Sequence, residues 1–343
     1  MIRSANNLNA AADLVSLFRE GLSRSKLCEG EVVVVYADSL TSPQYPAAFL
    51  AAAKDLGAQA IQIVQPSIAT GAGRAKPTTL IRDAMIAADF VIDVSTGGML
   101  HANEQGTILD SGTRILRIRE PEDCLQRMLP DAAVRARSIA GGKRLEGGDE
   151  IRIASDEGSD LTMRRGARKV LIQYGMADEP GRWDHWPTGM VNTTPEESSV
   201  EGELVIGPGS ILFPLSVYVT EPLRLRFEGG VAVAIEGGRE AVMLRDYIDD
   251  AGDENCRRLA HIGWGTEHRA RWHSLAVRGN DGGGGAEARS IYGGVLLALG
   301  ENRDLGGENA APLHIDIALR RSRFELDGAP LCENGKFLDE SLA

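Results

Sequence analysis

The sequence predicts an α/β domain followed by a strand-rich α+β domain, and three observations support this fold class. Apolar runs typical of buried strands alternate with helical segments through roughly the first 130 residues. A charged stretch with several glycines follows at residues 140–158, which is typical of a domain boundary. Beyond it, short apolar runs between turn glycines indicate β-strands. We therefore expect an α/β domain at residues 1–145 and an α+β domain at residues 146–343.

The composition is that of an ordinary globular protein. Hydrophobic residues make up 43% and charged residues 25% of the 343 positions, and no apolar run reaches the roughly 20 residues of a membrane span. The N-terminus lacks the basic and apolar blocks of a signal peptide. A net charge of -12 disfavours binding to nucleic acid or to anionic membranes. The four cysteines are scattered, so we expect reduced thiols and a cytoplasmic protein.

The first domain is expected to be a doubly wound, mostly parallel sheet. Residues 31–36 form a near-continuous β-branched run, which is typical of a strand covered on both faces. The expected strands are residues 31–36, 60–64, 90–94 and 113–118, and the expected helices are residues 8–22, 44–56 and 78–88. Ligands of such sheets bind beyond the carboxyl ends of the strands. The loop that leaves the third strand ends at His101, which is either a site residue or a surface histidine.

The second domain is expected to contain many strands and few helices. The expected strands are residues 151–154, 161–164, 170–174, 202–206, 210–215, 223–227 and 231–235, and the expected helices are residues 239–249 and 286–299. Residues 174–187 show no periodicity and are dense in charged and aromatic side chains, including Trp183 and Trp186. Tryptophans are rarely left exposed at random. This segment either walls a pocket for a small aromatic ligand or packs as an interface loop.

A strand near the C-terminus carries two polar side chains on one face. In residues 312–320 the apolar side chains alternate with His314 and Asp316, which therefore lie on the opposite face from the core. Two residues of a strand span roughly 6.5–7 Å, so both side chains can reach one metal ion. The alternatives are a buried hydrogen-bonded pair and an exposed polar face.

A metal site needs a third ligand, and His261 is the best partner for the pair. It lies in a short apolar strand that ends at Gly263, whereas His268 and His273 lie in a polar stretch and are expected to be exposed. Two imidazoles and one carboxylate with open positions are the ligand set of non-haem iron(II) oxygenases. Such a site keeps a net positive charge, which attracts an anionic substrate and leaves room for O₂.

Several segments together carry a family resemblance. They are Glu-Pro-Gly-Arg-Trp-Asp-His-Trp-Pro at 179–187, His-Ile-Gly-Trp-Gly at 261–265, His-Ile-Asp at 314–316, and Met-Leu-His at 99–101 with Glu-Gln at 104–105. In these segments the chain resembles the 2,5-dihydroxypyridine 5,6-dioxygenases, mononuclear iron(II) enzymes of pyridine and nicotinate catabolism. The resemblance implies opening of the ring to N-formylmaleamate and a fold related to that of aminopeptidase T-like metallopeptidases.

The resemblance also implies roles for particular residues. It makes His261, His314 and Asp316 the iron ligands, in the second domain, with the first domain contributing to the active-site cleft. It makes His101 and His185 catalytic, His101 as acid and base and His185 in contact with the substrate. The expected substrate contacts are Leu100, Glu179, Arg182, Trp183, His185 and Trp264. The expected partners are Fe(II), O₂ and a small aromatic N-heterocycle, in a homo-oligomer that binds neither nucleic acid nor membrane.

Two other classes of function stay open. An aminopeptidase-like hydrolase would use the same histidine and aspartate but needs further carboxylates for two metals, and Glu201, Glu203 and Glu240 are available. The segment around Trp183 favours the dioxygenase. A small-molecule binder with a vestigial site is the third class, and the intact ligand set argues against it.

Overall fold

The computed structural model describes residues 2–67, 77–99, 103–213, 215–278 and 285–343. The chain divides into two compact units. The first unit contains Met1–Asp131 and Tyr174–Pro187, and the second contains Ala132–Gln173, Thr188–Asp281 and Gly285–Ala343. The α/β character of the first unit and the strand-rich character of the second confirm the predicted fold class.

The first unit is built on a five-stranded parallel sheet in the order β2-β1-β3-β4-β8. Its strands are β1 (Val32–Asp38), β2 (Gln59–Gln65), β3 (Phe90–Asp93), β4 (Arg114–Ile118) and β8 (Trp183–Trp186). Its helices are α1 (Ile2–Arg24), α2 (Gln44–Asp55), α3 (Thr79–Ile86), α4 (Asn103–Asp110) and α5 (Glu122–Arg127). Val33 and Val35 belong to one apolar cluster with α1 and α2, and Val34 and Tyr36 to another with α3 and α4. This two-sided burial explains why β1 is apolar throughout.

Strand β8 was not expected from the sequence. It lies within residues 174–187, which show no apolar periodicity. It pairs in parallel with β4, and Trp186 packs edge-on against Phe18 in the core of the unit. The Asp184 carboxylate is fully buried and accepts a 2.7 Å hydrogen bond from the Arg182 guanidinium. This pairing places residues 174–187 in the first unit, so the units do not follow a single cut of the chain at residue 145.

The second unit contains two antiparallel sheets. One has the order β14-β13-β10-β6-β5-β18-β19-β20 and the other the order β12-β11-β17-β16-β15-β9-β7. The strands are β5 (Glu150–Ala154), β6 (Asp160–Arg164), β7 (Val170–Gln173), β9 (Met190–Thr193), β10 (Glu201–Ile206), β11 (Ile211–Leu212), β12 (Val217–Tyr218), β13 (Leu223–Glu228), β14 (Val231–Glu236), β15 (Leu259–Gly265), β16 (Val295–Gly300), β17 (His314–Leu319), β18 (Arg323–Leu326), β19 (Ala329–Glu333) and β20 (Lys336–Phe337). The two sheets share one large apolar core.

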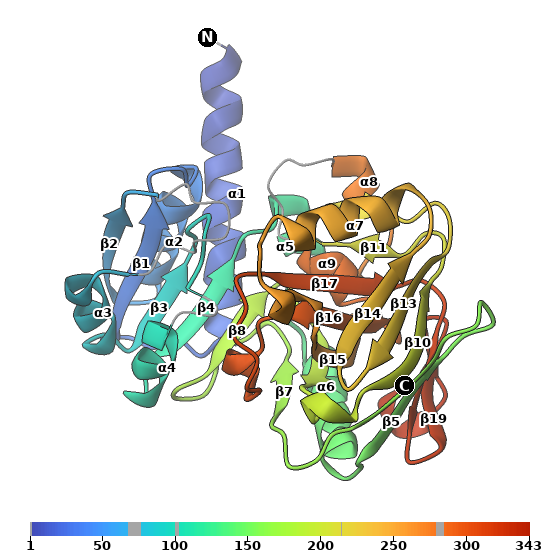
Figure 1. Ribbon diagram of the computed structural model, residues 1–343. Helices are drawn as coiled ribbons and strands as arrows, with labels where there is room; N and C mark the ends of the chain where they lie inside the picture. The colour runs from blue at the N-terminus through green and yellow to red at the C-terminus, as the bar shows by residue number, and fades with distance from the viewer. Residues whose placement is uncertain (1, 68–76, 100–102, 214, 279–284) are drawn as a thin grey trace. The chain divides into compact units, whose positions relative to one another are not determined.

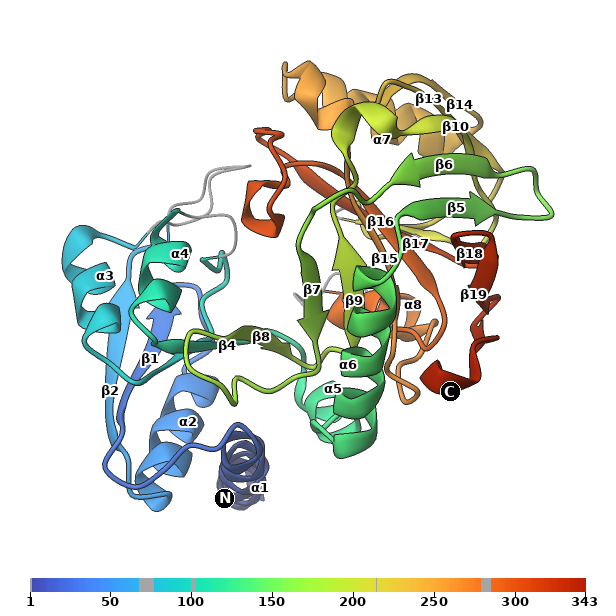
Figure 2. The same ribbon diagram turned by 90° about the horizontal axis from the view of Figure 1, so that it is seen from below.

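Short helices complete this unit. They are α6 (Ala132–Glu146), α7 (Arg239–Asp249), α8 (Ser274–Arg278) and α9 (Ala286–Arg289), with 3₁₀ turns at Glu197–Ser199, Glu254–Arg257, Arg303–Leu305 and Glu340–Leu342. Helix α6 lies along β7 and β9 (Figure 2). Its Gly142 allows a close approach, because a Cβ atom there would lie 2.2 Å from the Ile172 side chain.

The predicted helix at residues 286–299 is wrong. Helix α9 ends at Arg289, and the chain turns at Gly293 and Gly294 into the central strand β16. Every residue of β16 is buried. A strand covered on both faces has the same continuous apolar run as a buried helix, so periodicity alone did not separate the two.

Two predictions from the composition can be compared with the structure. None of the described helices is long and apolar enough to cross a membrane. The four cysteines are free thiols, as predicted. Cys28 is exposed and the other three are buried.

Candidate metal centre

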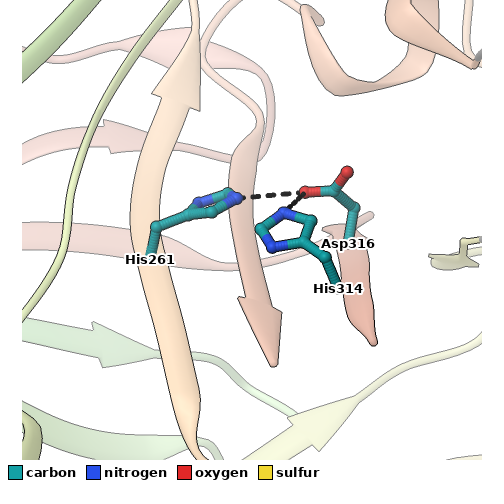
Figure 3. Close-up of side chains that lie close together, drawn as sticks. All are labelled: His261, His314 and Asp316. Carbon is teal, nitrogen blue, oxygen red and sulfur yellow. Dashed lines mark hydrogen bonds and ion pairs between the residues drawn. The ribbon is translucent and has the colours of Figure 1, made fainter. Parts of the chain in front are cut away.

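Three neighbouring strands of the seven-stranded sheet bring His261, His314 and Asp316 together. His261 lies on β15, and the other two side chains lie on β17, with β16 between these strands. Ala298 of β16 pairs with His261 on one side and with Asp316 on the other. Residues paired across antiparallel strands point to the same face. The small Ala298 side chain therefore leaves room for the imidazole and the carboxylate to meet. Figure 3 shows the three side chains pointing toward one another.

The alternation predicted for β17 is confirmed. Ile315 and Ile317 point into the core shared by the two sheets, so His314 and Asp316 lie on the other face. The neighbour of His314 across the sheet is Gly300. Its φ angle is +95°, and a Cβ atom there would lie 2.1 Å from the carbonyl oxygen of Leu313. Glycine is therefore required beside His314.

The three side chains present their donor atoms to one point. The His261 Nε2 atom lies 3.1 Å and the His314 Nε2 atom 3.4 Å from the Oδ1 atom of Asp316. One donor atom from each residue lies within 4.8 Å of the other two. First-row divalent metals bond nitrogen and oxygen at about 2.0–2.2 Å, so the cluster has the size and the donor chemistry for a single ion.

Buried surroundings orient His314 and shift the pKa values of His261 and Asp316. The Nδ1 atom of His314 donates a 2.8 Å hydrogen bond to the carbonyl oxygen of Glu301, which leaves Nε2 as the atom able to bind a metal. Burial lowers the pKa of His261, although Asp316 acts in the opposite direction. Burial alone would raise the pKa of Asp316, but Arg289 and the two histidines hold it well below its usual range. The centre thus offers two imidazole nitrogens and one carboxylate oxygen as donor atoms.

Arg289 is a residue of this centre that the sequence did not reveal. Its Nη1 atom lies 2.5 Å from the Oδ2 atom of Asp316, so the second carboxylate oxygen is engaged while Oδ1 faces the histidines. Arg289 lies at the end of α9, 27 positions before Asp316. No spacing rule connects a helix end to a strand that far along the chain, so the contact could not be predicted.

The other predicted site residues are placed as follows. Leu100 and His101 lie outside the described residues. His185 lies on β8 in the first unit, with its ring 4.8 Å from that of Trp183. Trp264 lies on β15, but its ring packs against Phe324 in the core, on the opposite face from His261.

Two further predicted substrate contacts lie in the segment before β8. Glu179 is exposed. The guanidinium of Arg182 lies 3.7 Å from the centre of the Tyr174 ring and also binds Asp184. Arg182 therefore helps to hold this segment in place.

The carboxylates considered for a second metal are engaged elsewhere. Glu201 accepts a hydrogen bond from the backbone of Gly229, Glu203 pairs with Arg224, and Glu240 is bound by Thr220 and Arg239. Within the described ranges, the one group of three possible metal ligands consists of His261, His314 and Asp316. His268 and His273 are exposed, as predicted.

Comparison with known proteins covers nearly the whole chain. Residues 13–339 match the family model described as 2,5-dihydroxypyridine 5,6-dioxygenase. A curated protein of that name from Pseudomonas putida (strain KT2440) is 35% identical over 328 residues, which cover 92% of this chain and 93% of the relative.

Two solved structures are similar to the chain. The structure of 2,5-dihydroxypyridine dioxygenase from Pseudomonas putida KT2440 has a TM-score of 0.92 and 34% identity, with 97% of this chain and 99% of that chain covered. The structure of wild-type AmpT from Thermus thermophilus has a TM-score of 0.61 and 17% identity, with coverage of 95% and 99%. The similarity to AmpT shows only that the two proteins share a fold.

Proposed function

Since the chain belongs to the 2,5-dihydroxypyridine 5,6-dioxygenase family, we propose that it opens the ring of 2,5-dihydroxypyridine with one iron(II) ion held by His261, His314 and Asp316. Family membership confirms the predicted ring-cleaving dioxygenase of pyridine catabolism. We propose four further points: the metal, its ligands, the substrate and the product N-formylmaleamate. The observation that carries it is the convergence of these three side chains on one face of the sheet.

The donor set fits iron(II) in number and in kind. Two imidazoles and one carboxylate fill three of about six positions and leave the others for substrate and O₂. When bound, iron(II) supplies the redox chemistry that allows O₂ to react with the ring. The single carboxylate leaves the loaded centre positively charged, which favours a substrate in its anionic form. Arg289 adds a further positive charge on the Asp316 side.

We also propose roles for two further histidines, His101 and His185. We assign proton transfer at the ring hydroxyl to His101, because an imidazole with a pKa near ~6.5 works in both directions around neutral pH. We assign a substrate contact to His185. Its backbone N–H donates a 2.8 Å hydrogen bond to the buried Asp184 carboxylate, which fixes its place on β8. Leu100, Glu179, Arg182 and Trp183 stay predicted contacts, whereas the ring of Trp264 faces the core and is not proposed as one.

The hydrolase alternative lacks a specific observation in its favour. Its extra carboxylates are bound by other groups, and the similarity to AmpT concerns the fold. A two-metal hydrolase would also turn over without O₂.

Metal replacement tests the proposal. Enzyme stripped with a chelator should lose turnover of 2,5-dihydroxypyridine, and anaerobic addition of Fe²⁺ should restore it. Zn²⁺ should occupy the same centre and inhibit, because it has no redox chemistry. Full turnover by the stripped enzyme, or turnover restored equally by Zn²⁺ without O₂, would contradict the proposal.

We also propose a cytoplasmic homo-oligomer. The free cysteines support a reducing compartment. Sedimentation of the purified protein measures the oligomeric state, and a monomer at micromolar concentration would contradict this part.

A further inference from the structure

Strand β9 carries one buried polar side chain, Asn192, on the same face as the metal ligands, and a second, Thr194, directly follows the strand. The register pairs Asn192 of β9 with Gly263 of β15, which lies two residues beyond His261. Alternate residues of a strand share a face, so Asn192 and His261 point to one side of the sheet. Val191, the residue before Asn192, confirms this assignment, because it belongs to the core on the other side of the sheet.

Polar atoms of these three side chains have no hydrogen-bond partner in the part of the chain that the structure describes. They are Asn192 Oδ1, Thr194 Oγ1 and His261 Nδ1. Asn192 is 1% exposed and Thr194 is fully buried. Leaving a buried polar group unpaired costs roughly 1–3 kcal/mol, and three such atoms on or directly after neighbouring strands are unusual. A polar ligand bound against this face would satisfy them.

Small residues surround Asn192 on the side of the metal ligands. Its neighbour Gly263 has no side chain, and a Cβ atom there would lie 2.7 Å from the Cβ of Asn192. On β16, Leu296 pairs with Gly263, whereas Ala298 pairs with His261 and with Asp316. The diagonal from Asn192 to His261 therefore passes Gly263 and no large side chain of β15.

We propose that the Asn192 carboxamide binds the lactam of 2,5-dihydroxypyridine in its 5-hydroxy-2-pyridone form, an inference that rests on the proposed function. A lactam has an N–H donor beside a carbonyl acceptor. A carboxamide has the complementary pair, so Oδ1 accepts from the ring N–H and Nδ2 donates to the ring carbonyl. Diagonal neighbours on antiparallel strands lie about 7–8 Å apart. A six-membered ring with two oxygen substituents can span from Asn192 to the metal ligands at His261.

This contact would make Asn192 a specificity-determining residue. Hydroquinone has the same two oxygen substituents in the same relative positions but no lactam. A site that hydrogen-bonds a polar group of its substrate discriminates strongly against an analogue lacking that group, because its own buried groups are then unpaired. Asn192 should thus account for a preference for the pyridone over hydroquinone.

The test is anaerobic binding of both compounds to the iron-loaded enzyme, measured as dissociation constants for the wild type, Asn192→Leu and Asn192→Asp. Both substitutions should weaken binding of 2,5-dihydroxypyridine by about tenfold or more, because neither side chain can donate to the ring carbonyl. Hydroquinone binding should change by less than about threefold. Iron content should stay at the wild-type level. Thr193→Val, on the opposite face of β9, is the matched control and should leave the preference unchanged.

An unchanged preference in both Asn192 variants would overturn the inference, and so would an equal loss for both compounds, which would indicate a structural role. If the wild type itself neither binds nor turns over 2,5-dihydroxypyridine, the proposed function fails instead. The two failures are therefore distinguishable.

Discussion

Each proposed iron ligand lies on a strand whose core packing is made by other side chains. His261, His314 and Asp316 share the site face, whereas their neighbours Ile262 and Ile315 fill the core. We therefore expect His261→Ala, His314→Ala and Asp316→Ala to lose iron and activity while far-ultraviolet circular dichroism stays that of the wild type. Iron analysis and circular dichroism of the three variants are the measurements. Full iron in an active variant would remove that residue from the ligand set.

Arg289 is expected to act on the metal through Asp316. With Arg289→Gln the carboxylate loses the partner that holds its second oxygen, so the dissociation constant of iron should rise by about 10–100-fold. Arg289→Lys should recover part of this loss. If Arg289 acted on the iron only through its positive charge, then its replacement by glutamine would strengthen iron binding. Tighter iron binding by Arg289→Gln would therefore contradict the positioning role. Anaerobic titration with Fe²⁺ measures the constant.

His101 is expected to act in catalysis without binding the metal. His101→Ala should keep its iron, whereas kcat should fall on the order of 10²–10⁴-fold for a lost general acid and base. Iron content and steady-state rates separate the two effects. An unchanged kcat would remove His101 from the proton-transfer step, and a loss of iron would make it part of the metal centre.

At the scale of the strands, Ala298 of β16 is what allows the ligands to meet. Ala298→Leu should fill the space between His261 and Asp316 and abolish iron binding. The matched control is Ala318→Leu, a buried alanine on the same face of β17 that is two residues beyond Asp316. Both substitutions overpack the interior and should cost about 1–3 kcal/mol of stability. Only Ala298→Leu should lose iron, and equal iron content in both variants would contradict this explanation.

The sequence predicted the strands that carry the ligands but not the strand between them. Alternation of apolar and polar residues identified β17, and a short apolar run identified β15. Strand β16 is apolar on both faces, so its sequence does not differ from that of a buried helix. The role of Ala298 and the contact from Arg289 depend on pairing and on long-range packing, which spacing along the chain does not encode.

At the scale of the whole molecule, the α/β unit and the two-sheet unit match the expected fold class, and the family confirms the ring-cleaving dioxygenase. Strand β8 shows the limit of prediction from sequence. Its aromatic and charged residues gave no periodic signal, and it joins the first sheet from a distant part of the chain by pairing with β4.

The fate of O₂ tests the central claim most directly, that a single iron centre of three protein ligands catalyses dioxygenation of the ring. The measurement is prompt mass spectrometry of the product formed from 2,5-dihydroxypyridine by the iron-loaded enzyme under labelled O₂ in ordinary water. Three protein ligands leave iron(II) with open positions for both substrate and O₂. We expect two labelled oxygen atoms in each product molecule and one O₂ consumed for each substrate. A product without label, formed equally fast without O₂, would contradict the account in favour of a hydrolase.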